Sequence, residues 1–242
     1  MLDRQSSLPL HAQLESIIRH KIEDEEWPID TCIPSENELS KIYGISRMTV
    51  RSVLNRFVDA GLLYRSQGKG TFVAEPKIVS SPLVRYGIRE QLEQMGYETT
   101  TKMISFEKIP ASAKVSRLLD IKRGSDIFVV KRLRSIKNEP LSFHVSYVPV
   151  IYFPGLENQD LEHHQMCNVI EKTYNYPIQR RTETLEATTA NTEEAWLLSV
   201  HPKSPVLLLE NMVYTDKDVP MEYSRIIFRG DKIKLKLEYQ RS

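Results

Sequence analysis

The stretch PSENELSKIYGISRMTVRSVLNRFVDAG, residues 34–61, decides the fold of the N-terminal part of the chain. Ser35 is a good helix N-cap, and Glu38 three residues later completes a capping box. Gly44 supplies the residue that tolerates positive φ where this helix ends, and Ser46 caps the next helix. That next helix carries an apolar stripe at helical spacing, formed by Val50, Val53, Leu54, Phe57 and Val58. The stretch therefore predicts two helices joined by a short turn.

The segments on either side of this pair complete a small domain over residues 1–75. Apolar residues recur at helical spacing from Leu10 to Ile22, with Pro9 suited to the first helical position. After the pair, 62–66 and 71–73 read as two short strands around a Gly-Lys-Gly tip, which is a β-hairpin pattern. Three helices followed by a hairpin predict a winged helix-turn-helix.

This domain has the charges expected of a DNA-binding surface. Residues 41–70 hold six Lys and Arg against Asp59 alone, a local charge of +5 in a chain whose net charge is +1. Arg47 and Arg51 are four residues apart on one helix face, opposite the apolar stripe, and arginine can read guanine in the major groove. Ser46 and Thr49 are suited to phosphate contacts. The alternative is a solvated helix face with ordinary surface arginines.

These motifs together resemble the GntR family of bacterial regulators. The resemblance rests on the 34–39 and 43–51 segments quoted above, on AGLLYR at 60–65 and on GKGTFV at 68–73. It implies that Arg47 and Arg51 read bases, that Thr49 holds a phosphate, and that Gly68 and Lys69 probe the minor groove. Asn37 stands where many members have Arg, and it could still contact phosphate or base. The candidate DNA-binding residues are Ser35, Asn37, Ser46, Arg47, Thr49, Arg51, Gly68, Lys69 and Gly70.

The rest of the chain predicts an interdomain linker at 76–82 and an α+β domain at 83–242. Two prolines and two serines with little periodicity mark the linker at 75–82. Helices are expected at 88–95, 115–119, 161–174 and 191–200, the last with a capping box. Strands are expected at 127–136, 141–148, 206–214, 220–228 and 233–239. Short turns between consecutive strands predict an antiparallel sheet with one covered face.

Strand alternation places polar residues on an otherwise apolar face of this sheet. Arg132 and Arg134 continue the face begun by Phe128 and Val130, which is costly unless the guanidinium groups meet an anion or a carboxylate. Glu222 shares a face with Ser224, Ile226 and Phe228 on another strand. Two cations and a carboxylate suit an acidic metabolite such as a sugar phosphate. An internal Arg–Glu salt bridge that supports the sheet is the alternative.

The second domain resembles the UTRA ligand-binding domain of the HutC subfamily, which has a chorismate-lyase-like fold. The resemblance rests on the segments 130–134, 139–141, 146–149, 220–223 and 228–231. The sequence departs from the subfamily at four places: His144 replaces Glu, Phe228 replaces Tyr, Tyr86-Gly87 stands where Ser or Thr often begins a helix, and Gln165 or Met166 replaces Ser. The candidate effector-binding residues are Tyr86, Gly87, Arg132, Arg134, His144, Tyr147, Glu222 and Phe228. His144 could accept a different ligand group, sense pH, or be a satisfied structural residue.

These features predict a ligand-responsive transcription regulator. We expect a homodimeric repressor that is released from a palindromic, double-stranded operator by a small anionic metabolite. The alternatives are a DNA-binding protein whose second domain only dimerises, and an enzyme related to chorismate lyase. Against the enzyme, the sequence shows no nucleophile–base pair, metal-ligand spacing or phosphate-cradling glycine loop, and no cofactor or metal is expected. Two distant cysteines, no signal core and no long apolar run favour a cytoplasmic location.

Overall fold

The computed structural model describes residues 2–80 and 88–236, and the chain divides into two compact units. The first unit comprises Met1–Ile78 with Gly230–Lys232, and the second comprises Val79–Arg229 with Ile233–Ser242. The domain limits taken from the sequence, 1–75 and 83–242, stay a prediction. Within the predicted linker at 76–82, Ile78–Ser80 forms a short strand, β3, which pairs with β10 (Ile233–Leu235).

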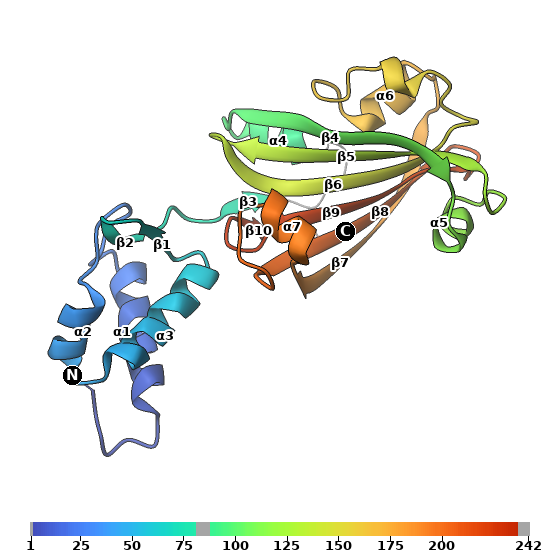
Figure 1. Ribbon diagram of the computed structural model, residues 1–242. Coiled ribbons are helices and arrows are strands. Elements are labelled where there is room, and N and C mark those ends of the chain that lie inside the picture. The colour runs from blue at the N-terminus through green and yellow to red at the C-terminus, as the bar shows by residue number, and fades with distance from the viewer. Residues whose placement is uncertain (1, 81–87, 237–242) are drawn as a thin grey trace, which may run out of the picture. The chain divides into compact units, whose positions relative to one another are not determined.

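The first unit is a winged helix-turn-helix, as the sequence predicts (Figure 1). Its elements are α1 (Leu10–Glu23), α2 (Glu36–Tyr43), α3 (Arg47–Asp59), β1 (Leu63–Ser66) and β2 (Gly70–Val73). The capping box of Ser35 and Glu38 is present, and Gly44 ends α2 with a φ of 63°. Pro9 is the N-cap residue of α1 rather than its first helical residue, so the helix begins one residue later than expected, at Leu10.

A single apolar cluster holds the three helices and the hairpin of this unit together. Leu14 and Ile18 of α1 meet Leu39 of α2 and the stripe of α3 in it. β1 and β2 pair in antiparallel register from Leu63–Val73 to Ser66–Gly70. Glycine suits position 70 at the tip of the wing, because the φ there is 130° and a Cβ would lie 2.8 Å from the Cys32 Sγ. The wing is thus fixed against the segment that precedes α2.

The second unit is built on a six-stranded antiparallel sheet with the order β4-β5-β6-β9-β8-β7. The strands are β4 (Thr99–Pro110), β5 (Asp126–Ile136), β6 (Glu139–Pro149), β7 (Ile178–Thr189), β8 (Pro205–Thr215) and β9 (Pro220–Arg229). The helices are α4 (Ile88–Gln94), α5 (Ala113–Leu118), a 3-10 turn (Leu156–Asn158), α6 (Met166–Lys172) and α7 (Thr192–Leu197).

The sheet is covered on both faces, so the expectation of one covered face was wrong. Ile127 and Val129 of β5 belong to a cluster that contains residues of α5 and α7. Phe128 and Val130, which alternate with them, belong to a second cluster that contains Met166, Val169 and Ile170 of α6. Figure 1 shows α6 on one side of the sheet and α5 on the other. The central strands consequently have two inward faces.

Five other elements differ from the sequence prediction. β4 and β7 were not predicted. α6 begins only at Met166, because the residues from Leu161 to His164 form turns rather than helix. α7 ends at Leu197, and Ser199 adopts a φ of 54° just beyond it. β10 ends at Leu235, and the predicted strand beyond residue 236 lies outside the described residues.

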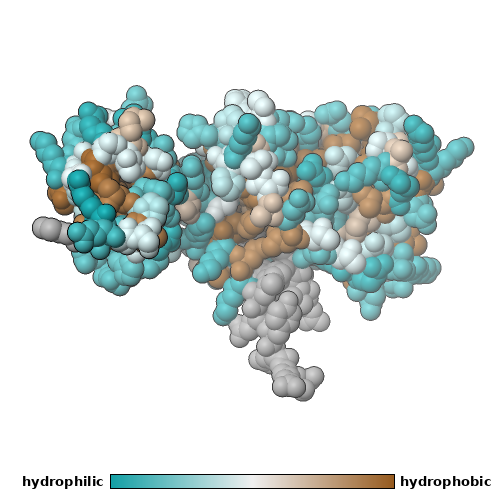
Figure 2. All heavy atoms as spheres, turned by 90° about the horizontal axis from the view of Figure 1, so that it is seen from below, coloured by the Kyte–Doolittle hydropathy of each residue, from teal (hydrophilic) through white to brown (hydrophobic). Residues whose placement is uncertain are grey.

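The surface is mostly hydrophilic, with hydrophobic residues exposed between polar ones, on the side shown in Figure 2. Trp196 and Ile151 are the most exposed large hydrophobic residues, at 79% and 78%. In the part of the chain that the structure describes, no helix combines the length and the apolar character needed to cross a membrane.

We expect Asn191→Ala to lower the free energy of unfolding by about 1 kcal/mol, because Asn191 accepts the backbone N–H of Glu194 in the capping box of α7. Urea denaturation followed by tryptophan fluorescence measures the effect, since Trp196 lies in the same helix. Asn191→Asp keeps a capping oxygen and serves as the control. Equal stability of the Ala and Asp variants would contradict a role for this cap.

Candidate DNA-binding and ligand-binding sites

The two arginines of the recognition helix α3 lie in different environments. Arg47 is exposed and, among the described residues, makes no hydrogen bond or ion pair. Arg51 Nε donates to both carboxylate oxygens of Glu36, at 3.1 Å and 2.9 Å. The hydrogen bond and the charge of Glu36 raise the pKa of Arg51. Arg51 is therefore held at the surface by a contact from the first turn of α2.

Glu36 connects three elements of the winged helix-turn-helix. Besides Arg51 of α3, it accepts a hydrogen bond from Arg65 of β1 at 3.3 Å. Arg65 also donates to Asn55 of α3 at 2.7 Å. No local pattern in the sequence marks Glu36, because its partners Arg51 and Arg65 lie 15 and 29 residues further along the chain. The network joins α2, α3 and the wing strand beside the expected reading surface.

The short polar residues of the DNA-binding candidates are partly engaged within the protein. Ser46 Oγ accepts the Thr49 N–H at 3.1 Å, and the two hydroxyl groups lie 2.8 Å apart. The Ser35 hydroxyl donates to Glu38 at 2.7 Å, so it serves the α2 cap. Asn37 is exposed.

The tip of the wing is exposed at Gly68, Lys69 and Gly70. A Cβ at Gly68 would meet nothing within 4 Å, so this backbone is open to a close approach. Arg47 and Lys69 are the two cations of the candidate set without a partner among the described residues, and Arg51 keeps its pair with Glu36.

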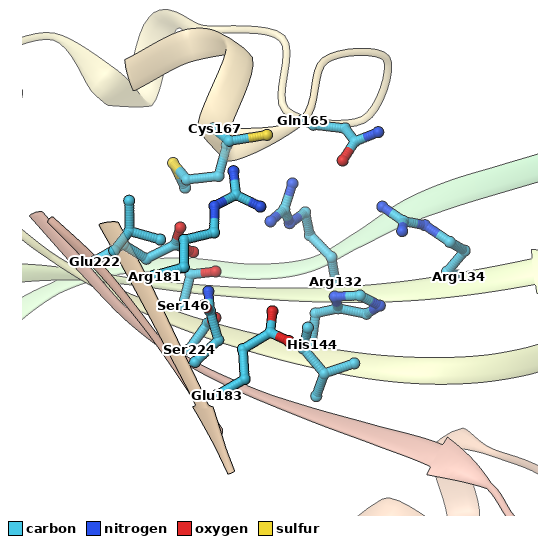
Figure 3. Close-up of a pocket in the computed structure, with 14 residues that line it drawn as sticks. Arg132, Arg134, His144, Ser146, Gln165, Cys167, Arg181, Glu183, Glu222 and Ser224 are labelled. Carbon is cyan, nitrogen blue, oxygen red and sulfur yellow. The ribbon is translucent and has the colours of Figure 1, made fainter. Parts of the chain in front are cut away.

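A polar cavity of about 70 Å³ lies in the second unit between the sheet and the α6 segment (Figure 3). Four of the sequence-predicted effector residues line it: Arg132, Arg134, His144 and Glu222. The remaining lining residues were not among the candidates, although the sequence placed Ser224 and Ile226 on the face of Glu222 and singled out Gln165 and Met166. They are Ser146, Gln165, Met166, Cys167, Arg181, Glu183, Asn211, Val213, Ser224 and Ile226. Five strands of the sheet, β5 to β9, therefore contribute side chains to one site.

The strand register explains how these residues come together. Arg132 of β5 lies opposite His144 of β6, which lies opposite Ile226 of β9. One row further, four polar residues follow each other across the sheet: Ser146, Ser224, Asn211 and Glu183. Because successive side chains alternate between faces, every residue of these rows points to the α6 side.

Arg132 is a buried charge of the cavity wall, with 5% of its surface exposed. Its Nη1 donates to the Leu161 carbonyl at 3.2 Å. Its Nε, also buried, has no hydrogen-bond partner among the described residues. Burial lowers the pKa of Arg132, and the charges of Glu222 and Cys167 act in the opposite direction. Arg134 beside it donates to the Thr101 hydroxyl at 3.4 Å.

His144 is a neutral residue of the cavity wall near pH 7. Its Nε2 lies 2.8 Å from the Ser142 Oγ. Burial holds the pKa of His144 well below 6.5, and the nearby charges of Arg134 and Arg132 lower it further. The imidazole can therefore donate or accept a hydrogen bond but does not carry charge at neutral pH.

The other predicted effector residues lie elsewhere. Phe228 is fully buried, does not line the cavity, and meets the His144 ring edge-on at a centroid distance of 6.4 Å. Tyr147 stacks on Tyr223 at 5.5 Å and lines a separate cavity, because it alternates with His144 and Ser146 and faces the other side of the sheet. Tyr86 and Gly87 lie outside the described residues.

The missed strand β7 supplies two charged residues, Arg181 and Glu183. Figure 3 shows both side chains entering the space beneath α6 into which Arg132 also points. Burial raises the pKa of the Glu183 carboxyl, and the charge of Arg181 opposes this shift. Over the described ranges, no cluster of three or more His, Cys, Asp and Glu is placed to hold a metal ion.

A winged helix-turn-helix joined to a domain with a polar cavity defines the class of two-domain transcription regulators. The sequence profile for "Bacterial regulatory proteins, gntR family" matches residues 10–73, and that for the UTRA domain matches residues 94–234. The chain belongs to the GntR family and carries a UTRA domain, as the motifs predicted. It is a DNA-binding regulator with an effector-binding domain, and not an enzyme.

Named relatives extend over nearly the whole chain. The HTH-type transcriptional repressor NagR of Bacillus subtilis is 30% identical over 231 residues, which cover 96% of this chain and 95% of NagR. The histidine utilization repressor of Pseudomonas putida is 28% identical over 94% of this chain and 90% of its own. The crystal structure of PhnF from Mycobacterium smegmatis shares the fold, with a TM-score of 0.66 and 22% identity over 96% of this chain and 99% of PhnF.

We expect His144→Gln to reduce the loss of stability in mild acid. Below about pH 6.5 the unfolded chain binds a proton at His144 that the folded chain does not, so the free energy of unfolding falls as the pH drops from 6.5 toward the lowered pKa. Urea denaturation at pH 7.5 and at several lower values measures the difference. His201→Gln, at an exposed position, is the control. An unchanged acid dependence in the His144 variant would show that folding does not lower the pKa of this imidazole.

Proposed function

We propose that the protein is a homodimeric repressor that leaves a palindromic operator when an anionic metabolite binds in the cavity between the sheet and α6. The observation that carries the proposal is the buried Arg132 Nε, which lacks a partner while Arg134 and Arg181 line the same cavity. A planar guanidinium group suits the multidentate binding of phosphate or carboxylate. The relatives whose names describe repressors support the direction of regulation.

The proposed role of the first unit is to read the operator through α3 and the wing. Arg47 and Arg51 approach base edges, Ser46 and Thr49 approach phosphate, and Lys69 at the wing tip enters the minor groove. One short recognition helix contacts few base pairs, so two copies related by a two-fold axis supply the specificity of a palindromic site. The segment at 76–82 is the proposed place where a domain rearrangement is absorbed.

A second domain that serves only to dimerise does not explain the cavity. Dimerisation gives no reason to bury a cation with an unpaired Nε, since an apolar residue would cost less there. An internal salt bridge would explain a carboxylate whose charge acts on Arg132, as that of Glu222 does, but not the unpaired atom. The sensor role accounts for both.

A thermal-shift screen of phosphorylated sugars, amino sugars and small carboxylates tests the sensor role. A ligand at 100 times its dissociation constant should raise the free energy of unfolding by about 2.7 kcal/mol, and Arg132→Ala should abolish the shift. Arg123→Ala, an exposed arginine of the same unit, is the control. A shift that survives in the Arg132 variant would place the ligand elsewhere.

Substitutions in the first unit separate base reading from backbone contact. On an operator selected from random DNA, Arg51→Ala should cost about 1–3 kcal/mol and relax the specificity at one base position. Lys69→Ala should weaken specific and random DNA about equally and reduce the salt dependence. Arg56→Ala, on another face of α3 where it pairs with Glu15, is the control. Equal losses on both DNAs for Arg51→Ala would exclude base reading by this residue.

A further inference from the structure

Four buried polar atoms around the cavity have no hydrogen-bond partner within the described residues, and they fall into two chemical groups. Arg132 Nε and Gln165 Nε2 are donors. Glu183 Oε1 and Asn211 Oδ1 are acceptors. Buried polar atoms are almost always paired in folded proteins, so four such atoms around one cavity indicate a polar occupant. Its chemistry must complement both groups.

The two acceptors lie side by side on the β7–β8 part of the sheet. Glu183 and Asn211 are register partners on adjacent strands. Asn211 Nδ2 donates to the Ser224 Oγ at 3.3 Å, which leaves its Oδ1 as the unpaired atom. Arg181 is close enough to favour the charged form of Glu183, but it does not hydrogen-bond the buried Oε1. The acceptors therefore remain available to a donor inside the cavity.

The two donors lie on other elements. Arg132 belongs to β5, and Gln165 is the N-cap residue of α6, where it makes no capping bond with its side chain. Figure 3 shows the Glu183 carboxylate rising from the sheet toward the space in which the Arg132 side chain ends, with Gln165 beside α6. A ligand whose anion lies next to Arg132 and Gln165 would therefore face two hydrogen-bond acceptors, Glu183 Oε1 and Asn211 Oδ1, on the β7–β8 side of the cavity.

We propose that Glu183, with Asn211, selects a ligand that carries an ammonium or hydroxyl group in addition to its anion. The ligand class is an amino- or hydroxy-substituted phosphate or carboxylate. An ammonium group gains a charge-assisted bond to Glu183, whereas a methyl group in its place leaves both acceptors unpaired. The inference rests on the proposed function, since it requires an anion in the same cavity.

Two matched sets of short probes test this selection on the full chain. The phosphate set is phosphoethanolamine, 2-hydroxyethyl phosphate and monoethyl phosphate, and the carboxylate set is β-alanine, 3-hydroxypropanoate and propanoate. Within each set the anion is constant and only the second group changes. Short probes suit a cavity of about 70 Å³. Isothermal titration calorimetry measures each affinity.

In at least one set, the amino and hydroxy probes should bind about tenfold or more tightly than the unsubstituted probe. Glu183→Gln retains size and a hydrogen-bonding oxygen but removes the charge. It should therefore reduce the preference for the amino probe and leave that for the hydroxy probe largely unchanged. Glu186→Gln, three residues along β7 and lining the cavity on the other face, is the matched control.

The outcomes distinguish this inference from the proposed function. Equal binding of all three members of a set, lost in Arg132→Gln but insensitive to Glu183→Gln, would overturn the selection by Glu183 and leave the anion site intact. A loss of amino preference in the Glu186 control as well would also count against Glu183. Failure of every probe, with inorganic phosphate included, would overturn both proposals.

Discussion

Burial of the Arg132 guanidinium group is the constraint on which the cavity depends. A cation removed from water is costly unless hydrogen bonds or opposite charges replace its hydration. The Leu161 carbonyl and the charge of Glu222 supply part of this replacement, which ties the segment before α6 and strand β9 to the middle of the sheet. Along β5 the apolar face ends at Val130, so the core cannot continue over the guanidinium group. The polar cavity begins where that apolar face ends.

In the first unit, charge is instead paired at the surface. Exposed ion pairs contribute little to stability, so the bonds of Glu36 to Arg51 and Arg65 act mainly on orientation. An arginine side chain has five N–H donors. Arg51 faces Glu36 with its Nε and with one of its two terminal nitrogens, Nη2. In the proposed complex with DNA, the other terminal nitrogen is the one that faces a base edge. An arginine held in this way would lose less side-chain entropy on binding than Arg47, which has no partner among the described residues.

The sequence predicted the elements whose pattern is local, and it missed those at the border of the sheet. The sequence predicted the capping boxes, the left-handed glycine after α2 and the alternation of β5 and β9. Each of these features depends on residues that are only a few positions apart. β4 and β7 are the outer strands, and most of β7 is exposed, so no apolar alternation marks it. Arg181 and Glu183 were missed because their strand was missed. Tyr147 was assigned from the resemblance, although alternation with His144 already places it on the other face.

The size of the cavity bears on which ligands can enter. Pockets that enclose drug-sized ligands measure about 300–1,000 Å³, several times the 70 Å³ present here. The sheet face of the cavity is fixed by strand pairing, whereas the facing wall includes Gln165, Met166 and Cys167 of the α6 segment. Among the described residues, that segment is tied to the sheet by Arg132, through Leu161, and by the backbone N–H of Met103, which donates to Glu162. In the proposed complex an anion binds beside the bond from Arg132 Nη1 to the Leu161 carbonyl, so the same guanidinium group would serve both the ligand and the segment before α6.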